Sequence, residues 1–149
     1  MINDNLKLRG DVAIVLKDKN GNVKESREIN NLVVTAGLTF ICSRMAGASA
    51  GVMSHMALGS STTAAAAGQT DLVSILGSRE VLDSSTASAN TIVYVSSFEA
   101  GEGTGAVTEA GVFNASSSGT MLCRTVFPVV NKGADDTMSV TWTITLTAS

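Results

Sequence analysis

The sequence predicts an all-β protein, an antiparallel β-sandwich of jelly-roll type with one short helix and an N-terminal β-hairpin. Residues 137–147 alternate between apolar and hydroxyl side chains, which is typical of a strand with one buried face. The pair Asn20-Gly21 lies between two further alternating segments and suits a tight hairpin turn. Short strand-like runs with Gly- and Ser-rich connections make up most of the remainder, which favours a sandwich.

The length and composition indicate a single domain over residues 1–149. A chain of this size buries roughly 70% of its unfolded surface, so it can form a core without disulfides or a metal. Charged residues make up 15% of the chain, below the roughly 25% that is usual for soluble domains. Residues 1–30 carry six basic and five acidic side chains. We therefore expect a charged N-terminal arm and hairpin there and a nearly neutral body over residues 31–149.

Nucleic acid, membranes and secretion are not expected from this sequence. The formal net charge of −3 provides no attraction to phosphates. No segment approaches the roughly 20 apolar residues of a membrane-spanning helix. The first residues have neither the cationic start nor the apolar run of a signal peptide.

The N-terminal hairpin is defined by the parity of its apolar residues. From Leu6 to Leu16 they occupy every second position except that of Gly10, which we interpret as a bulge or bend. Residues 23–29 return as a charged strand, and their Lys and Glu side chains suit an exposed sheet edge.

One short helix is expected over Thr35–Met45. Thr35 is a suitable N-cap, and Arg44 near the end interacts favourably with the helix dipole. We expect the helix to pack across an open end of the sheets. The stripe expected to be buried consists of Leu38, Ile41, Cys42 and Met45.

The other elements follow from alternation and from turn residues. Their expected positions are strands at residues 53–59, 79–82 and 91–98, a helical turn at 70–76, a loop at 83–90, a hairpin of 108–114 with 120–127, and a loop at 131–136. The 79–82 strand is expected at an edge. Trp142 lies on the apolar face of the last strand.

A catalytic or metal site is not predicted. The single histidine, His55, follows Ser54, and neighbours on a strand point to opposite faces, so we expect no hydrogen bond between their side chains. One histidine and two distant cysteines, Cys42 and Cys123, do not form a set of zinc ligands. The cysteines are expected to be buried, reduced thiols, and the spacing leaves their pairing open.

Three further motifs have ordinary structural interpretations. Asp135-Asp136 lacks the other ligands of a calcium loop and is interpreted as a solvated turn. Gly101 and Gly103 match a loosened dinucleotide fingerprint, but a strand pattern follows them, so we expect a tight connection with positive φ. The glycosylation pattern at Asn114 is attributed to chance, because no signal peptide is expected.

Glu109 and Arg124 are the only charged residues of the third hairpin. With the turn centred near residues 117–118, Glu109 lies opposite Val126 and diagonal to Arg124 on the same face. A structural ion pair is the first interpretation of these two residues. Contact with a partner subunit is the second.

Several strands and turns of the second half carry a resemblance. They are residues 56–59 (Met-Ala-Leu-Gly) with the Thr/Ala-rich loop after them, residues 102–115, residues 119–127, residues 131–137 and the Thr-Trp-Thr-Ile-Thr-Leu ending. In these segments, which span about residues 50–147, the chain resembles a family of small virion proteins of tailed phages. The resemblance includes turn sequences as well as the apolar pattern.

The resemblance implies a capsid cement (decoration) protein of jelly-roll type, a non-enzymatic component that lies on the outside of a phage head between capsid subunits. It implies the major capsid protein and further copies of this chain, as a dimer or trimer, as partners on the virion after synthesis in the host cytoplasm. No catalytic residue and no cofactor is implied. Candidate partner contacts, on an N-terminal arm, a neutral loop and the third hairpin, are Met1, Ile2, Leu6, Leu8, Ser60, Thr62, Thr63, Glu109 and Arg124.

Two other functions remain open. The resemblance extends to modules of tail fibres and tail-associated chains, so a tail or head-fibre component is the first alternative. A carbohydrate-binding module is the second. Such modules usually display aromatic side chains beside polar groups, whereas Trp142 is expected to face the core.

Overall fold

The computed structural model describes residues 5–148 as a sheet of nine antiparallel strands with one helix. The strands are β1 Leu6–Lys17, β2 Val23–Val33, β3 His55–Gly59, β4 Glu80–Val81, β5 Ser84–Ser88, β6 Thr91–Phe98, β7 Gly105–Phe113, β8 Met121–Lys132 and β9 Thr137–Ala148, and the helix α1 is Thr35–Met45. Their order across the sheet is β4-β3-β7-β8-β2-β1-β9-β6-β5.

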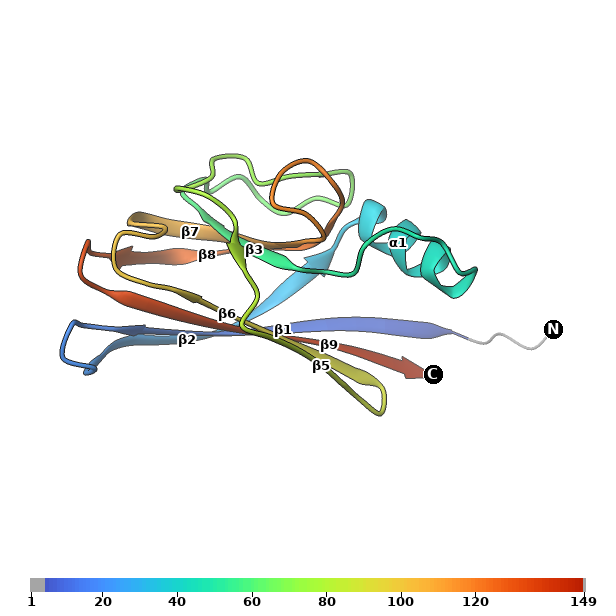
Figure 1. The fold of residues 1–149 in the computed structure, drawn as a ribbon, viewed down its shortest axis with the longest axis horizontal. Coiled ribbons are helices and arrows are strands. Elements are labelled where there is room, and N and C mark those ends of the chain that lie inside the picture. The colour runs from blue at the N-terminus through green and yellow to red at the C-terminus, as the bar shows by residue number, and fades with distance from the viewer. Residues whose placement is uncertain (1–4, 149) are drawn as a thin grey trace.

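The sheet curls on itself so that its two halves face one another. Figure 1 shows β3, β7 and β8 in one layer and β1, β2, β5, β6 and β9 in the other. Strand β2 connects the layers, because it pairs with β1 along most of its length and with β8 only through Leu32 and Val33. The predicted all-β antiparallel sandwich with one short helix is confirmed, and its two layers belong to one continuous sheet.

The core lies between the two layers. Strand β9 contributes every second residue to it, as the alternation predicts, and Trp142 has no exposed surface. Across the ladder, Val12 and Tyr94 both pair with Trp142 from β1 and β6. On the other side of β9 the threonines from Thr137 to Thr145 are half-buried, because β1 and β6 flank the strand, whereas Thr147 is exposed.

The N-terminal hairpin has the predicted turn. The Asp18 carboxylate accepts hydrogen bonds from the backbone N–H groups of Asn20 and Asn22, at 2.9 and 3.0 Å, and Gly21 has a φ of +82°. The prediction of a bulge or bend at Gly10 is wrong. Gly10 pairs regularly with Asn31, and a Cβ atom there would overlap the Asn31 side-chain amide. Glycine therefore makes room for a side chain on the neighbouring strand.

The helix occupies the predicted residues but presents a different face to the core. Val34 is its N-cap residue and provides no side-chain cap, so the expectation for Thr35 is wrong. Leu38, Cys42 and Met45 are exposed, with 84% of the Met45 surface accessible. Gly37 sets this orientation, because a Cβ atom there would overlap the Leu122 carbonyl oxygen. Phe40 and Ile41 pack α1 against the core.

Two segments differ from the expected elements. Residues 70–76 contain no helical turn, because hydrogen bonds to a buried carboxylate hold them in an irregular path that is described below. Residues 84–88 form strand β5, although the small polar sequence suggested a loop. This strand pairs with β6 through a hairpin whose turn has Ala89 at a φ of 51°. The predicted edge strand at residues 79–82 is present as β4.

Candidate functional site

A long irregular segment covers the outer face of β7 and β8. We call residues 60–76 the clamped loop; it starts after β3 and contains no helix and no strand. Figure 1 shows it in green, outside the layer of β3, β7 and β8. Structureless loops of this length are uncommon in compact domains and are usually functional or disordered. Here the loop is held in place by a specific set of contacts.

The contacts are centred on the ion pair of Glu109 and Arg124. Glu109 lies on β7 opposite Val126 of β8, as the sequence predicts. Arg124 Nε donates to Glu109 Oε2 at 2.9 Å, and Arg124 Nη2 lies 2.8 Å from the same oxygen. Neither side chain has any exposed surface. The predicted structural ion pair is therefore confirmed.

The carboxylate of Glu109 binds the backbone of the clamped loop. Oε1 accepts from the N–H groups of Ser74, at 2.8 Å, and Ser61, at 3.3 Å. Oε2 accepts from the N–H group of Val73 at 3.1 Å. A buried carboxylate needs several donors to offset its lost hydration, and the loop supplies three of them.

The guanidinium of Arg124 binds the same loop from the other side. Its Nη2 donates to the Thr63 carbonyl at 2.9 Å, and its Nη1 donates to Gln69 Oε1 at 3.0 Å. Gln69 in turn donates to the Ala64 carbonyl and accepts from the Ala66 N–H group. The ion pair thus fixes both ends and the middle of the clamped loop.

Besides Glu109 and Arg124, Gly59 is the third residue on which the conformation of the clamped loop depends. It pairs with Glu109 across β3 and β7, and a Cβ atom there would overlap Glu109 Oε1 and lie 2.6 Å from the Ser74 carbonyl oxygen. Sequence reasoning identified the two charges but missed the loop as their partner. The loop binds the two charges mainly through backbone N–H and C=O groups. Every residue has these groups, so the amino-acid sequence does not show which of them take part.

The outward surface of the clamped loop is uncharged apart from Asp71. Ser60, Thr62 and Thr63 are exposed on it, as their candidate role requires. Val73 and Ile75 also face solvent, with 54% and 45% of their surfaces accessible. Glu109 and Arg124 themselves offer no surface to a partner in this conformation. They shape the loop from beneath.

The predicted N-terminal arm is part of the sheet from Leu6 onwards. Leu6 pairs with Ala148 and Leu8 with Leu146, so residues 6–8 form a ladder with β9. Leu8 packs against the core, whereas 69% of the Leu6 surface is exposed. The candidate contacts Met1 and Ile2 lie outside the described residues.

The prediction for Ser54 and His55 is wrong. Ser54 Oγ lies 2.7 Å from His55 Nδ1, because Ser54 precedes β3 and is not bound by strand alternation. No carboxylate within residues 5–148 is hydrogen-bonded to His55 to orient it as a catalytic base would be oriented. In the same described part of the chain, no group of three or more His, Cys, Asp or Glu residues is placed to hold a metal ion.

The cysteines and the charged turn also differ in part from expectation. Cys42 and Cys123 are both free thiols, but only Cys123 is buried, and burial raises its pKa well above the usual value. Asp135 is exposed, whereas Asp136 is buried and accepts from Lys24 Nζ at 2.8 Å and from the Gly133 N–H group at 2.7 Å. The Lys24 bond and the Gly133 bond lower the pKa of Asp136.

The connection between β6 and β7 is as predicted. Gly101 and Gly103 have φ values of +85° and +59°, so they provide the positive φ that this tight link needs. Gly103 is buried beside Leu58, and a Cβ atom there would lie 2.8 Å from the Leu58 side chain, so the residue serves packing as well as the turn.

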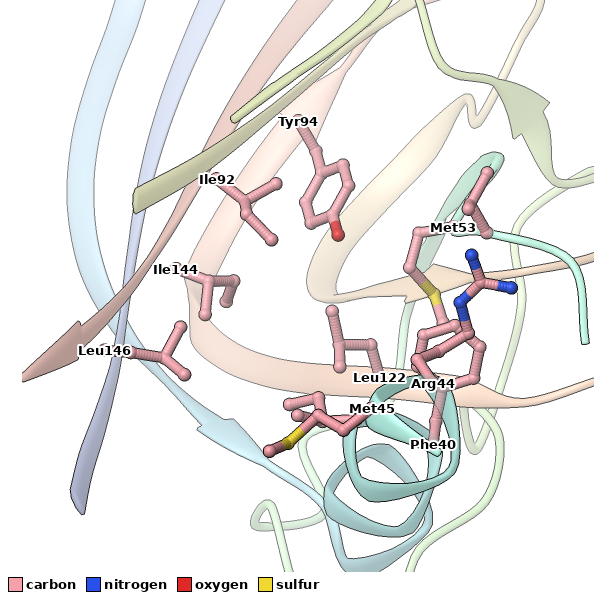
Figure 2. A pocket seen from close by; sticks show the side chains of 11 residues that line it. Phe40, Arg44, Met45, Met53, Ile92, Tyr94, Leu122, Ile144 and Leu146 are labelled. Carbon is pink, nitrogen blue, oxygen red and sulfur yellow. The ribbon is translucent and has the colours of Figure 1, made fainter. Parts of the chain in front are cut away.

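A cavity of about 470 Å³ opens beneath α1, at one end of the sandwich. Figure 2 shows its lining: Ile92 and Tyr94 come from β6, Ile144 and Leu146 from β9, and Met45 from α1. Trp142 and Tyr94 are buried, and Phe40, which lines the cavity, is half-buried.

Comparison with known proteins identifies no relative: no family model, no curated protein and no solved structure matches this chain. In the part of the chain that the structure describes, no helix is long and apolar enough to cross a membrane.

Proposed function

We propose that this chain is a non-enzymatic structural protein of a virion. Its proposed role is that of a capsid cement (decoration) protein, which binds the outside of a tailed-phage head and stabilises contacts between capsid subunits. The observation that carries the proposal is the clamped loop. Two fully buried charges hold an exposed and nearly uncharged segment in one conformation.

Pre-ordering of the loop favours binding to a large partner. Immobilising loop residues during association costs free energy, and a loop that is already fixed avoids most of that cost. A neutral surface with small hydroxyl and aliphatic side chains suits a protein partner, because the cores of protein interfaces are depleted in charged residues. Thr62, Val73 and Ile75 form such a surface here.

The proposed partners are the major capsid protein and further copies of this chain. Strand β5 offers one contact with a second copy, because it is a sheet edge with five exposed residues and no charged side chain. Uncharged edges are open to pairing with another strand. A dimer formed in this way presents two clamped loops to the shell.

The first test is the copy number of the chain in purified phage particles that carry it. Quantitative mass spectrometry should give a number comparable to that of the major capsid protein. A handful of copies per particle would contradict the cement role and favour the alternative of a tail or head-fibre component.

The second test concerns the clamped loop itself. The double variant Thr62→Glu/Val73→Glu places charges on its outward surface, and it should reduce binding to preformed shells in a sedimentation assay. Lys19→Glu, in the exposed turn between β1 and β2, makes the same change of two charge units and is a matched control that should bind as the wild type does. Equal binding by all three proteins would remove the loop from the interface.

A further inference from the structure

The cavity beneath α1 has the size and the walls of a ligand site. Its volume of about 470 Å³ lies within the range of roughly 300–1,000 Å³ that is typical of small-molecule pockets. Ile92, Ile144 and Leu146 form its sheet side, and Phe40 and Met45 form its helix side. Met45 at the rim is 84% exposed, so the cavity is open to solvent there.

One cation lines this otherwise apolar cavity. Arg44 Nη1 donates to the carbonyl oxygens of Ala48 and Ala50, at 3.1 and 2.8 Å, which fixes the plane of the guanidinium. Its Nε and Nη2 have no hydrogen-bond partner among residues 5–148. These two nitrogens form the edge of the guanidinium that binds a carboxylate through two parallel hydrogen bonds.

A second polar group faces the cavity from the sheet. Figure 2 shows the Tyr94 hydroxyl pointing into the space between β6 and α1. Within the described chain this hydroxyl has no hydrogen-bond partner, although most of the Tyr94 side chain is buried. The hydroxyl opens to the cavity, so a bound ligand with an oxygen acceptor would take a hydrogen bond from it there.

We propose that the cavity binds a small amphiphilic carboxylate, with an unbranched aliphatic tail of medium length and one anionic head group. The tail packs against Ile92, Ile144 and Leu146, and the carboxylate accepts from the free edge of Arg44. A carboxylate supplies the negative charge beside the Arg44 guanidinium that an entirely apolar occupant lacks. The proposal goes beyond the role on the virion and does not depend on it.

The test uses decanoate below its micelle concentration as the probe, with binding measured by isothermal titration calorimetry on the full chain. One molecule of decanoate should bind per chain. Arg44→Gln should weaken binding by roughly tenfold or more, because a hydrogen-bonded ion pair is lost. Arg9→Gln is the matched control, since Arg9 is exposed on β1 and does not line this cavity. It should bind decanoate as the wild type does.

Two further ligands and one variant separate the parts of the proposal. Decanol keeps the tail without the charge and should bind more weakly, and acetate keeps the charge without the tail and should not bind measurably. Leu146→Trp fills the cavity from its rim and should abolish decanoate binding while near-ultraviolet circular dichroism shows an intact fold. Absence of saturable decanoate binding would overturn the proposal. Equal affinity for decanol, or equal losses in Arg44→Gln and Arg9→Gln, would overturn the role of Arg44.

Discussion

At the scale of single residues, the two cysteines show how the same side chain takes different environments. Both were expected to be buried, but Cys42 lies on the exposed face of α1 because Gly37 turns the helix about its axis. Cys123 lies on β8 in the core, beside the Asn31 side chain that Gly10 accommodates. The apolar period of α1 could not predict this orientation, since it depends on one backbone contact with Leu122.

The difference predicts selective labelling. In the folded protein a maleimide should modify Cys42 alone, because Cys123 is inaccessible and burial raises its pKa, which suppresses the reactive thiolate. Mass spectrometry should show one label per chain before unfolding and two labels in denaturant. Cys42→Ser is the control and should take up no label while folded. Rapid modification of Cys123 in the native protein would contradict its placement.

At the scale of elements, the strands were largely predictable and the clamped loop was not. Alternation located β1, β6 and β9, and the turn at Asn20-Gly21 fixed the register of the first hairpin. The pairing of Glu109 with Val126 also followed from the sequence, because a hairpin register is set by its turn. The loop depends instead on backbone N–H groups that meet a carboxylate distant in sequence, and no local pattern records them.

Removal of the negative charge of Glu109 should unfold the clamped loop and destabilise the domain. Glu109→Gln leaves Arg124 buried without a counter-charge, and breaking a buried ion pair in this way costs about 3–5 kcal/mol of unfolding free energy. Chemical denaturation should measure this loss. Hydrogen exchange should show faster exchange at the N–H groups of Ser61, Val73 and Ser74, which Glu109 now protects.

Glu28→Gln is the matched control for Glu109→Gln. Glu28 is an exposed residue of β2, so the same chemical change there should alter the unfolding free energy by no more than about 0.5 kcal/mol. If Glu109→Gln were as mild as this control, and its loop amides stayed protected, the ion pair would not be what holds the loop.

At the scale of the whole molecule, one ion pair joins the turn ends of two strand pairs and links global stability to pH. Lys24 follows the first hairpin turn, and Asp136 precedes β9. The Lys24 hydrogen bond and the Gly133 N–H group lower the pKa of Asp136 from its usual 3.8. A lowered folded-state pKa means that the stabilisation is complete above pH 3.8 and is lost as the pH falls below that value.

Asp136→Asn should therefore lower the melting temperature at neutral pH, and the gap to the wild type should narrow as the pH falls below about 4. Asp135→Asn, an exposed neighbour, is the control and should follow the wild type across the whole range. Thermal melts followed by circular dichroism measure all three proteins. A gap that stays constant down to the lowest pH would show that Asp136 acts without its charge.

The layered all-β architecture was predictable at this scale, but the path of β2 was not. The two layers are continuous because Leu32 and Val33 pair with β8 after the rest of the strand has paired with β1. The sequence predicts a charged strand over residues 23–29, whereas β2 continues to Val33, and the position of β8 decides where its second neighbour begins. The cavity beneath α1 likewise results from how the helix meets the open end of the curled sheet.

The central position of β1 has a consequence for how the chain is made. Its two neighbours are β2, which follows at once, and β9, which is the last of the nine described strands in chain order. During synthesis the hairpin of β1 and β2 can form early. On the other side of β1, Val12 and Ile14 have no partner strand until β9 has been synthesised. While β3 to β8 are being synthesised, one edge of β1 therefore stays unpaired, and an unpaired strand edge favours aggregation until it is covered.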